Sequence, residues 1–291
     1  MLGFINAFKP PGMTSTAFGS FVRRLFGGAP VGHWGTLDPR ACGVLVLAVG
    51  YATRLLPLIA PTTKRYAFEI NLGSATDTGD AAGRAIAQAA PPVDWRERLA
   101  SVVAALVGPL DQVPPMFSAV KIEGRPLYAS ARKGGDVARA PRATRVHALR
   151  LIEAGEHAAR LSVECDAGLY VRVLCEEIGA RLGVPAHMGA LVRTAAGPFA
   201  IAQSMLPEEI SADPVRALID PLSVLVQPRI ELDAAGVARF VHGNGVAVDG
   251  HALRAVEHLV LAAGRLIGTG RLALANGNAT LTPTRVFSFL S

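Results

Sequence analysis

The run from Gly43 to Gly50, Gly-Val-Leu-Val-Leu-Ala-Val-Gly, constrains the fold of this chain more than any other segment. Its six inner residues are all apolar, and a glycine bounds the run at each end. A short apolar run with this composition is typical of a buried strand. We therefore expect a core strand here, which the rest of the chain has to cover.

The loop that precedes this strand carries a single carboxylate. It reads Gly32-His33-Trp34-Gly35-Thr36-Leu37-Asp38-Pro39, so glycine and proline stiffen the backbone around Asp38. An acid on a rigid loop beside a core strand is one way in which proteins hold a nucleophile or a base. Without further context, an aspartate in a loop is more often a turn or cap residue.

Length and composition bound the class of protein. The chain has 291 residues, 51% of them hydrophobic and 18% charged, which favours a globular protein with one large domain and one small domain. No apolar stretch approaches the ~18 residues of a membrane span, and the N-terminus lacks a signal-peptide pattern, so we expect a cytoplasmic protein. Cys42, Cys165 and Cys175 are too few and too irregularly spaced for a disulfide framework or a zinc site.

Positive charge is concentrated in one segment. Between Lys121 and Arg150 lie eight basic and two acidic residues, a surplus equal to the +6 net charge of the whole chain. Such a patch favours a polyanionic partner, most simply nucleic acid, although a solvated surface is the alternative. Prolines and glycines interrupt residues 113–145, which we expect to form a long basic loop.

The pattern of apolar residues predicts elements on both sides of this loop. Alternation predicts a strand over Lys64–Leu72, and further strands are expected over residues 147–152 and 160–165. A helix is expected over residues 173–182, whereas residues 186–199 have a mixed pattern. From about residue 228, glycines punctuate short apolar runs, which is typical of a small β-rich domain.

Six motifs occur in one order along the chain: Phe8-Lys9-Pro10-Pro11-Gly12-Met13-Thr14-Ser15, the Asp38 loop, Lys64-Arg65-Tyr66, Thr76-Asp77-Thr78-Gly79-Asp80, Gln112-Val113-Pro114-Pro115-Met116-Phe117-Ser118-Ala119-Val120-Lys121 and Tyr170-Val171-Arg172. Together they resemble the bacterial TruB-type tRNA pseudouridine synthases. The resemblance implies an α+β catalytic domain over residues 1–225, with a long mixed, mostly antiparallel sheet flanked by helices and loops. It also implies a small β-rich, PUA-like RNA-binding domain over residues 226–291.

The resemblance also implies an activity. Such an isomerase detaches uracil from C1′ of a uridine, turns it and rejoins it through C5, with no metal and no redox cofactor. The insert and the chain length favour uridine 55 in the TΨC loop of tRNA as the target. The expected partner is tRNA alone, with no membrane, no obligatory protein partner and a monomeric enzyme.

The matching positions suggest roles for the central residues of the site. Asp38 is the candidate nucleophile or base, and the residues leave both routes open. Arg172 is expected to hold Asp38 and to keep the pKa of its carboxyl low despite burial. Tyr170 is expected to line the pocket, on one face of an extended segment with Arg172. Tyr66 is expected to stack on the uracil.

Further residues are implied in RNA binding. His33 corresponds to a wedge that fills the space of the extruded base, Asp80 to a contact with neighbouring bases, and Leu191 to a residue that packs on the base. The basic loop is expected to be mobile without RNA and ordered with it, when it would place four side chains on phosphates: Arg132, Lys133, Arg139 and Arg142. Trp34 departs from the family, which usually has a smaller side chain there.

Three other functions remain open at this point. A pseudouridine synthase that acts on another or a guided RNA would share the motifs. An RNA chaperone that folds tRNA would need binding but only incidental catalysis. A base-removing glycosidase is disfavoured because the sequence shows no second well-placed carboxylate.

Overall fold

The computed structural model describes residues 2–59, 63–118, 121–122, 125–126, 137–248, 256–275 and 278–287. The chain divides into two compact units. The larger unit comprises residues 5–47 and 61–218, and the smaller one comprises residues 1–4, 48–60 and 219–291. Among the described helices, none is long and apolar enough to cross a membrane.

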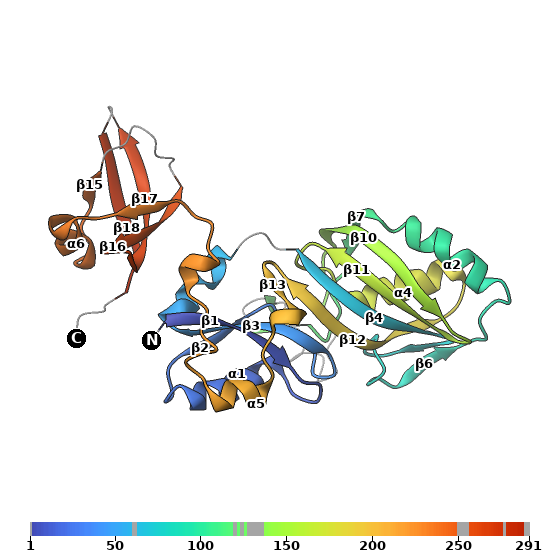
Figure 1. The fold of residues 1–291 in the computed structure, drawn as a ribbon. Coiled ribbons are helices and arrows are strands. Elements are labelled where there is room, and N and C mark those ends of the chain that lie inside the picture. Colours follow the sequence, from blue (N-terminus) through green and yellow to red (C-terminus); the bar gives the residue numbers. More distant parts are fainter. Residues whose placement is uncertain are drawn as a thin grey trace. The chain divides into compact units, whose positions relative to one another are not determined.

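A nine-stranded mixed sheet organises the larger unit (Figure 1). Its order is β1-β3-β12-β4-β11-β10-β7, with β2 paired to β3 and β13 paired to β12. Strand β12 runs parallel to β3, whereas the pairs β12–β4, β4–β11, β11–β10 and β10–β7 are antiparallel. The strands are β1 (Leu2–Lys9), β2 (Val31–Trp34), β3 (Cys42–Gly50), β4 (Lys64–Leu72), β7 (Gly108–Gln112), β10 (Arg142–Ala154), β11 (Ala158–Cys165), β12 (Ala186–Ala196) and β13 (Phe199–Ala200).

Helices pack on this sheet, and two short strand pairs lie outside it. Helix α4 packs on β12, and α2 packs against α4 and β10. The helices of the larger unit are α1 (Ser15–Leu25), α2 (Trp95–Ala104), α4 (Val171–Leu182) and α5 (Pro207–Ala212). The strand pairs are β5 (Ser74–Thr76) with β6 (Ala85–Gln88) and β8 (Lys121–Ile122) with β9 (Arg125–Pro126), and a 3₁₀ turn, η2, covers Ile201–Gln203.

The predicted core strand is confirmed. Strand β3 contains the whole run, and residues 43–49 are buried. Strand β4 has the predicted bounds, and its alternate residues Tyr66, Phe68, Ile70 and Leu72 are buried. The expected α+β class with a mostly antiparallel mixed sheet is therefore correct.

One local prediction is wrong. Tyr170 is extended, but Val171 and Arg172 are not, because α4 begins at Val171 with Tyr170 as its N-cap residue. Most of residues 186–199, for which the sequence pattern is mixed, form one strand, β12, whose pairing with β4 has two register shifts. Pairing with both β3 and β4 holds β12 in the sheet, and single-sequence periodicity does not report such long-range pairing.

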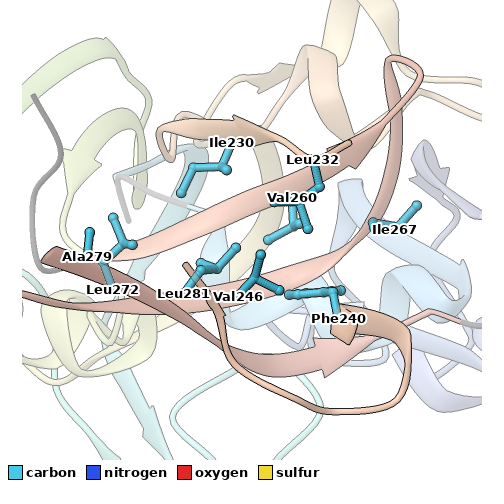
Figure 2. Packing of buried hydrophobic residues seen from close by; sticks show 9 residues of the cluster. All are labelled: Ile230, Leu232, Phe240, Val246, Val260, Ile267, Leu272, Ala279 and Leu281. Atoms are coloured by element: carbon cyan, nitrogen blue, oxygen red, sulfur yellow. The ribbon is translucent and has the colours of Figure 1, made fainter. Parts of the chain in front are cut away.

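The C-terminal part of the smaller unit is β-rich, as expected. Its five-stranded sheet has the order β14-β16-β17-β18-β15. The elements are β14 (Arg229–Glu231), α6 (Ala234–Val241), β15 (Val246–Val248), β16 (Glu257–Ala262), β17 (Arg265–Ala275) and β18 (Asn278–Val286), preceded by the 3₁₀ turns η1 (Tyr51–Leu58) and η3 (Pro221–Ser223). Figure 2 shows the core between α6 and this sheet, formed by Ile230, Leu232, Phe240, Val246, Val260, Ile267, Leu272, Ala279 and Leu281.

The close approach of β3 to β12 depends on a glycine. Gly43 has φ +101°, and a Cβ atom there would lie 2.3 Å from the carbonyl oxygen of Arg193. Backbone strain alone costs about 1–3 kcal/mol at such a position. We expect Gly43→Ala to lower the free energy of unfolding by more than this, because of the added clash. Gly12→Ala is the matched control, since Gly12 has φ +93° with open space around it. Equal losses in denaturant titrations of the two variants would contradict this packing.

Candidate active site

The loop that carries Asp38 connects β2 to β3, and a serine from α1 fixes its middle. Ser15 Oγ donates to the carbonyl of Leu37 at 3.0 Å and accepts from its backbone N–H at 2.9 Å. Both residues are buried. Since one hydroxyl satisfies both backbone groups of Leu37, the residue before Asp38 is held from the core side.

A buried arginine holds the start of the same loop. Arg193 on β12 has no exposed surface, and its Nη2 donates to the carbonyl of Gly35 at 2.8 Å. Its Nη1 lies 3.4 Å from the carbonyl of Thr36, and its Nε donates to that of Val44 at 2.7 Å. A buried guanidinium has to satisfy its donors within the protein. The three carbonyls therefore hold the Arg193 side chain in place, and the guanidinium in turn holds the loop.

The proline-rich motif near the N-terminus holds the end of the loop. Gly12 N–H donates to the carbonyl of Pro39 at 2.8 Å. Lys9 is fully buried, and its Nζ donates to the carbonyls of Pro10 and Met13, each at 2.8 Å. Hydrogen bonds from α1, from β12 and from the proline-rich motif therefore hold the loop on both sides of Asp38.

The expected contact between Arg172 and Asp38 is present. Arg172 Nε lies 3.1 Å from Asp38 Oδ2, and Nη2 donates to Oδ1 at 3.4 Å. The remaining donors reach the carbonyls of Thr78 at 3.0 Å and Phe117 at 2.7 Å. This paired geometry orients the carboxylate as well as attracting it.

The expected direction of the Asp38 pKa is wrong. Burial raises the pKa of the carboxyl above its ordinary value of 3.8. The Arg172 guanidinium and, to a smaller extent, the Lys9 ammonium oppose this rise, while the charge of Asp80 adds to it. Desolvation exceeds the attraction of these cations, so the carboxylate binds protons more readily than a solvent-exposed one does.

A cavity of about 310 Å³ opens in front of this ion pair. The pocket residues proposed from the sequence, namely Asp38, Tyr66, Tyr170, Arg172 and Leu191, all line it. The other lining residues are Thr36, Leu37, Lys64, Ser118, Gly168, Leu169, Val171 and Met188. The wall is thus part apolar and part charged.

Strand register places the aromatic and aliphatic walls of the cavity. Tyr66 on β4 pairs with Arg193 on β12, and Phe68 pairs with Leu191. Side chains that are paired or two residues apart share a face of the sheet, so Tyr66 and Leu191 meet at the cavity. Burial raises the pKa of the Tyr66 hydroxyl, while the charge and hydrogen bonding of Arg193 oppose that rise.

Tyr170 is held through its backbone by a residue of another motif. Gln112, buried at the end of β7, accepts from the Tyr170 N–H at 2.8 Å and donates to its carbonyl at 3.3 Å. The N-terminus of α4 is thereby fixed beside the cavity, which also fixes Arg172.

His33 and Asp80 lie next to the cavity without lining it. His33 Nε2 is 3.3 Å from the hydroxyl of Thr36, and burial lowers the pKa of the imidazole. Asp80 accepts from the Thr78 hydroxyl and from the Ala82 N–H, each at 2.8 Å, and forms a backbone bridge with Met188. Both stay candidates for RNA contact.

The basic loop is only partly described. Arg132 and Lys133 lie outside the described residues. Arg139 donates to the carbonyls of Val137 and Pro114, each at 3.1 Å. Arg142 begins β10 and is exposed.

Four contributors to the site were not assigned these roles from the sequence: Lys64, Gln112, Ser15 and Arg193. One signal was available for Arg193, because it occupies an inward position between Leu191 and Ala195 in an alternating strand. A lone arginine on the buried face of a strand has to find carbonyl or carboxylate partners, which marks it as structural or functional.

The arrangement suits covalent or acid–base chemistry on a flat heterocycle. One oriented carboxylate lies beside a buried tyrosine and an aliphatic side chain, in a cavity bordered by cations. A carboxylate can attack electron-poor carbon or remove a proton, and an aromatic ring can stack on a base.

Known proteins with similar sequences share one activity in their names. The profile "TruB family pseudouridylate synthase (N terminal domain)" matches residues 23–171, and "tRNA pseudouridylate synthase B C-terminal domain" matches residues 172–227. The tRNA pseudouridine synthase B of Symbiobacterium thermophilum is 43% identical over 84% of this chain and 83% of its own length. That of Aromatoleum aromaticum is 39% identical over 98% of this chain and 92% of its own length.

Solved structures share the fold. A chain in the crystal structure of a Cbf5–Nop10–Gar1 complex aligns with a TM-score of 0.71 at 25% identity, covering 98% of this chain and 85% of its own. A chain in an H/ACA RNP bound to a substrate RNA containing 2′-deoxyuridine aligns with a TM-score of 0.69 at 23% identity, with the same coverage.

The balance of forces on Asp38 gives a direct prediction. We expect its carboxyl to titrate above 3.8, and to titrate higher still in Arg172→Met, because the opposing cation is gone. Carbon-detected NMR of labelled aspartate measures both values. Arg40→Met, which removes an exposed cation two residues from Asp38, is the control and should leave the titration unchanged. A lower pKa in Arg172→Met would contradict the prediction.

Proposed function

Because the chain belongs to the TruB family of pseudouridine synthases, isomerases named for their action on tRNA, we propose that it converts uridine 55 in the TΨC loop of tRNA to pseudouridine. The observation that carries this proposal is the ion-paired Asp38, held by its loop at the wall of a cavity that Tyr66 and Leu191 also line.

In the proposed reaction, the bond between C1′ and N1 breaks and a bond between C1′ and C5 forms. C5 loses a proton and N1 gains one, so atoms balance without an oxidant or water. Asp38 either attacks the sugar or base as a nucleophile or removes the C2′ proton, and both routes need it ionised. Arg172 favours that ionised form against the effect of burial.

The neighbouring residues supply binding and orientation in this proposal. Tyr66 stacks on the uracil, while Leu191 and the Tyr170 ring close the pocket around it. The uridine has to leave its stack before it enters the cavity, and His33 fills the vacated space. Asp80 contacts the bases beside the target.

RNA binding extends beyond the cavity in the same proposal. Arg132, Lys133, Arg139 and Arg142 contact phosphates from the basic loop of residues 113–145. We assign residues 1–225 to catalysis and residues 226–291 to a PUA-like RNA-binding domain. The protein acts as a monomer in the cytoplasm, on tRNA alone, without a metal, cofactor or protein partner.

The test uses purified protein and an unmodified tRNA transcript, with pseudouridine mapped by position. We expect modification at uridine 55, and also in an isolated TΨC stem-loop. A requirement for guide RNA or for protein partners would contradict the proposal and favour a guided enzyme. No pseudouridine at all would overturn it.

Substitution of Asp38 separates catalysis from binding. We expect Asp38→Asn to reduce the rate of pseudouridine formation by more than about 100-fold, because neither proposed route can operate without the carboxylate. Filter binding should show nearly unchanged affinity for tRNA. Asp111→Asn, which alters an exposed carboxylate on β7, is the control. If a cellular phenotype of gene deletion is rescued by Asp38→Asn, tRNA folding rather than modification is the primary role.

A further inference from the structure

In the part of the chain that the structure describes, four Lys and Arg side chains lie at the site, and three of them have partners for their donors. Arg172 donates to Asp38 and to two backbone carbonyls. Arg193 donates to the carbonyls of Gly35, Thr36 and Val44. Lys9 donates to carbonyls of its own motif. Among the described residues that line the cavity, Asp38 is the only carboxylate, and Arg172 already pairs with it.

Lys64 is the fourth cation and differs from the others. Its side chain lines the cavity, and within the described part of the chain its ammonium has no carboxylate or hydrogen-bond partner. Lys64 is the first residue of β4, two residues before Tyr66 and on the same face of the sheet. Lys64 is half-buried and Tyr66 is buried, so the ammonium lies nearer to solvent than the stacking residue does.

The surroundings of Lys64 hold its ammonium in place without neutralising it. Nζ lies 5.9 Å from the centre of the Trp34 ring, a cation–π distance. A Cβ atom on Gly35 would lie 2.9 Å from Nζ, so the ammonium packs directly against this glycine. Trp34 and Gly35 thus form a seat for this cation at the end of β2.

The charge of Lys64 is left uncompensated. Burial and the nearby Arg193 lower the pKa of its ammonium to about 8. The thiol of Cys165 is close enough to affect it, yet burial raises the pKa of that thiol to about 12, so it is neutral at physiological pH. A partly desolvated cation with no anionic neighbour is a ready-made site for an anion from the ligand.

We propose that the Lys64 ammonium, seated on Trp34 and Gly35, binds a phosphate that flanks the extruded uridine. This inference rests on the proposed function and specifies how the substrate is held. A phosphate carries the full negative charge that this site lacks, whereas a uracil carbonyl carries only a partial one. Because Tyr66 lies deeper than Lys64, a base stacked on Tyr66 leaves its backbone on the Lys64 side.

Trp34 acquires a role in this arrangement. Its ring supports the ammonium of Lys64 by a cation–π contact instead of by an ion pair, so the charge stays available to the RNA. A smaller residue at position 34 would leave the lysine stem without this support. We therefore infer that Trp34 positions Lys64 and does not itself contact the target base.

The experiment measures binding of a TΨC stem-loop in the inactive Asp38→Asn background. We expect Lys64→Met to weaken binding and to lower the slope of log affinity against log salt by about 0.7–0.9, the value for one lost phosphate contact. A neutral methylphosphonate at one of the two phosphates flanking the target uridine should weaken binding to the Lys64 protein. The same substitution should have no effect on binding to the Lys64→Met protein.

Matched variants guard against indirect effects. Arg65→Met removes the exposed neighbour on the opposite face of β4 and should keep the full methylphosphonate penalty. Trp34→Leu should reduce that penalty in part. Lys64→Gln replaces Lys64→Met if circular dichroism shows that the methionine variant is unfolded.

Two results would overturn the inference. One is an equal methylphosphonate penalty with and without Lys64. The other is weaker binding of Lys64→Met at an unchanged salt slope, which would mean contact with a neutral group of the base. Both are read from binding alone, so they are distinct from failure of the proposed function, which would appear as no pseudouridine with the unsubstituted protein.

Discussion

The rest of the site depends on the hydrogen bonds that hold the loop between β2 and β3 in place. Arg193 holds its first residues by their carbonyls, and Ser15 closes both backbone groups of Leu37. The segment around Gly12 holds Pro39. The side chains of Arg193 and Ser15 are buried, so water offers no competing partners for these contacts. Asp38 therefore has a fixed backbone before any substrate arrives.

Among the described residues around the cavity, cations outnumber carboxylates, which suits an enzyme that binds negatively charged RNA. Burial pushes the carboxyl of Asp38 toward its neutral form, and Arg172 pulls it back toward the ionised one. Lys9 and Arg193 donate hydrogen bonds to backbone carbonyls and so fix the conformation of the loop. Among these cations of the described residues, Lys64 has no partner for its ammonium, so in our proposal the cations that shape the loop differ from the one that binds the substrate.

Local sequence pattern was sufficient for the features that depend on neighbours along the chain. Alternation gave β4 its bounds, and the apolar run located β3. The motif resemblance brought Asp38 and Arg172 together across 134 positions. Features that depend on long-range packing could not be derived this way. The start of α4, the direction of the Asp38 pKa and the role of Arg193 each follow from burial and strand pairing, which periodicity does not encode.

We infer that buried contacts from outside the loop position Asp38 for chemistry. The most direct test is the single-turnover rate of pseudouridine formation by Ser15→Ala at saturating tRNA, alongside its affinity for tRNA. Loss of both bonds to Leu37 should slow the chemical step about tenfold or more while leaving affinity unchanged, because small displacements of a reacting group are costly. An unchanged rate in a folded Ser15→Ala protein, or a loss confined to affinity, would contradict the claim.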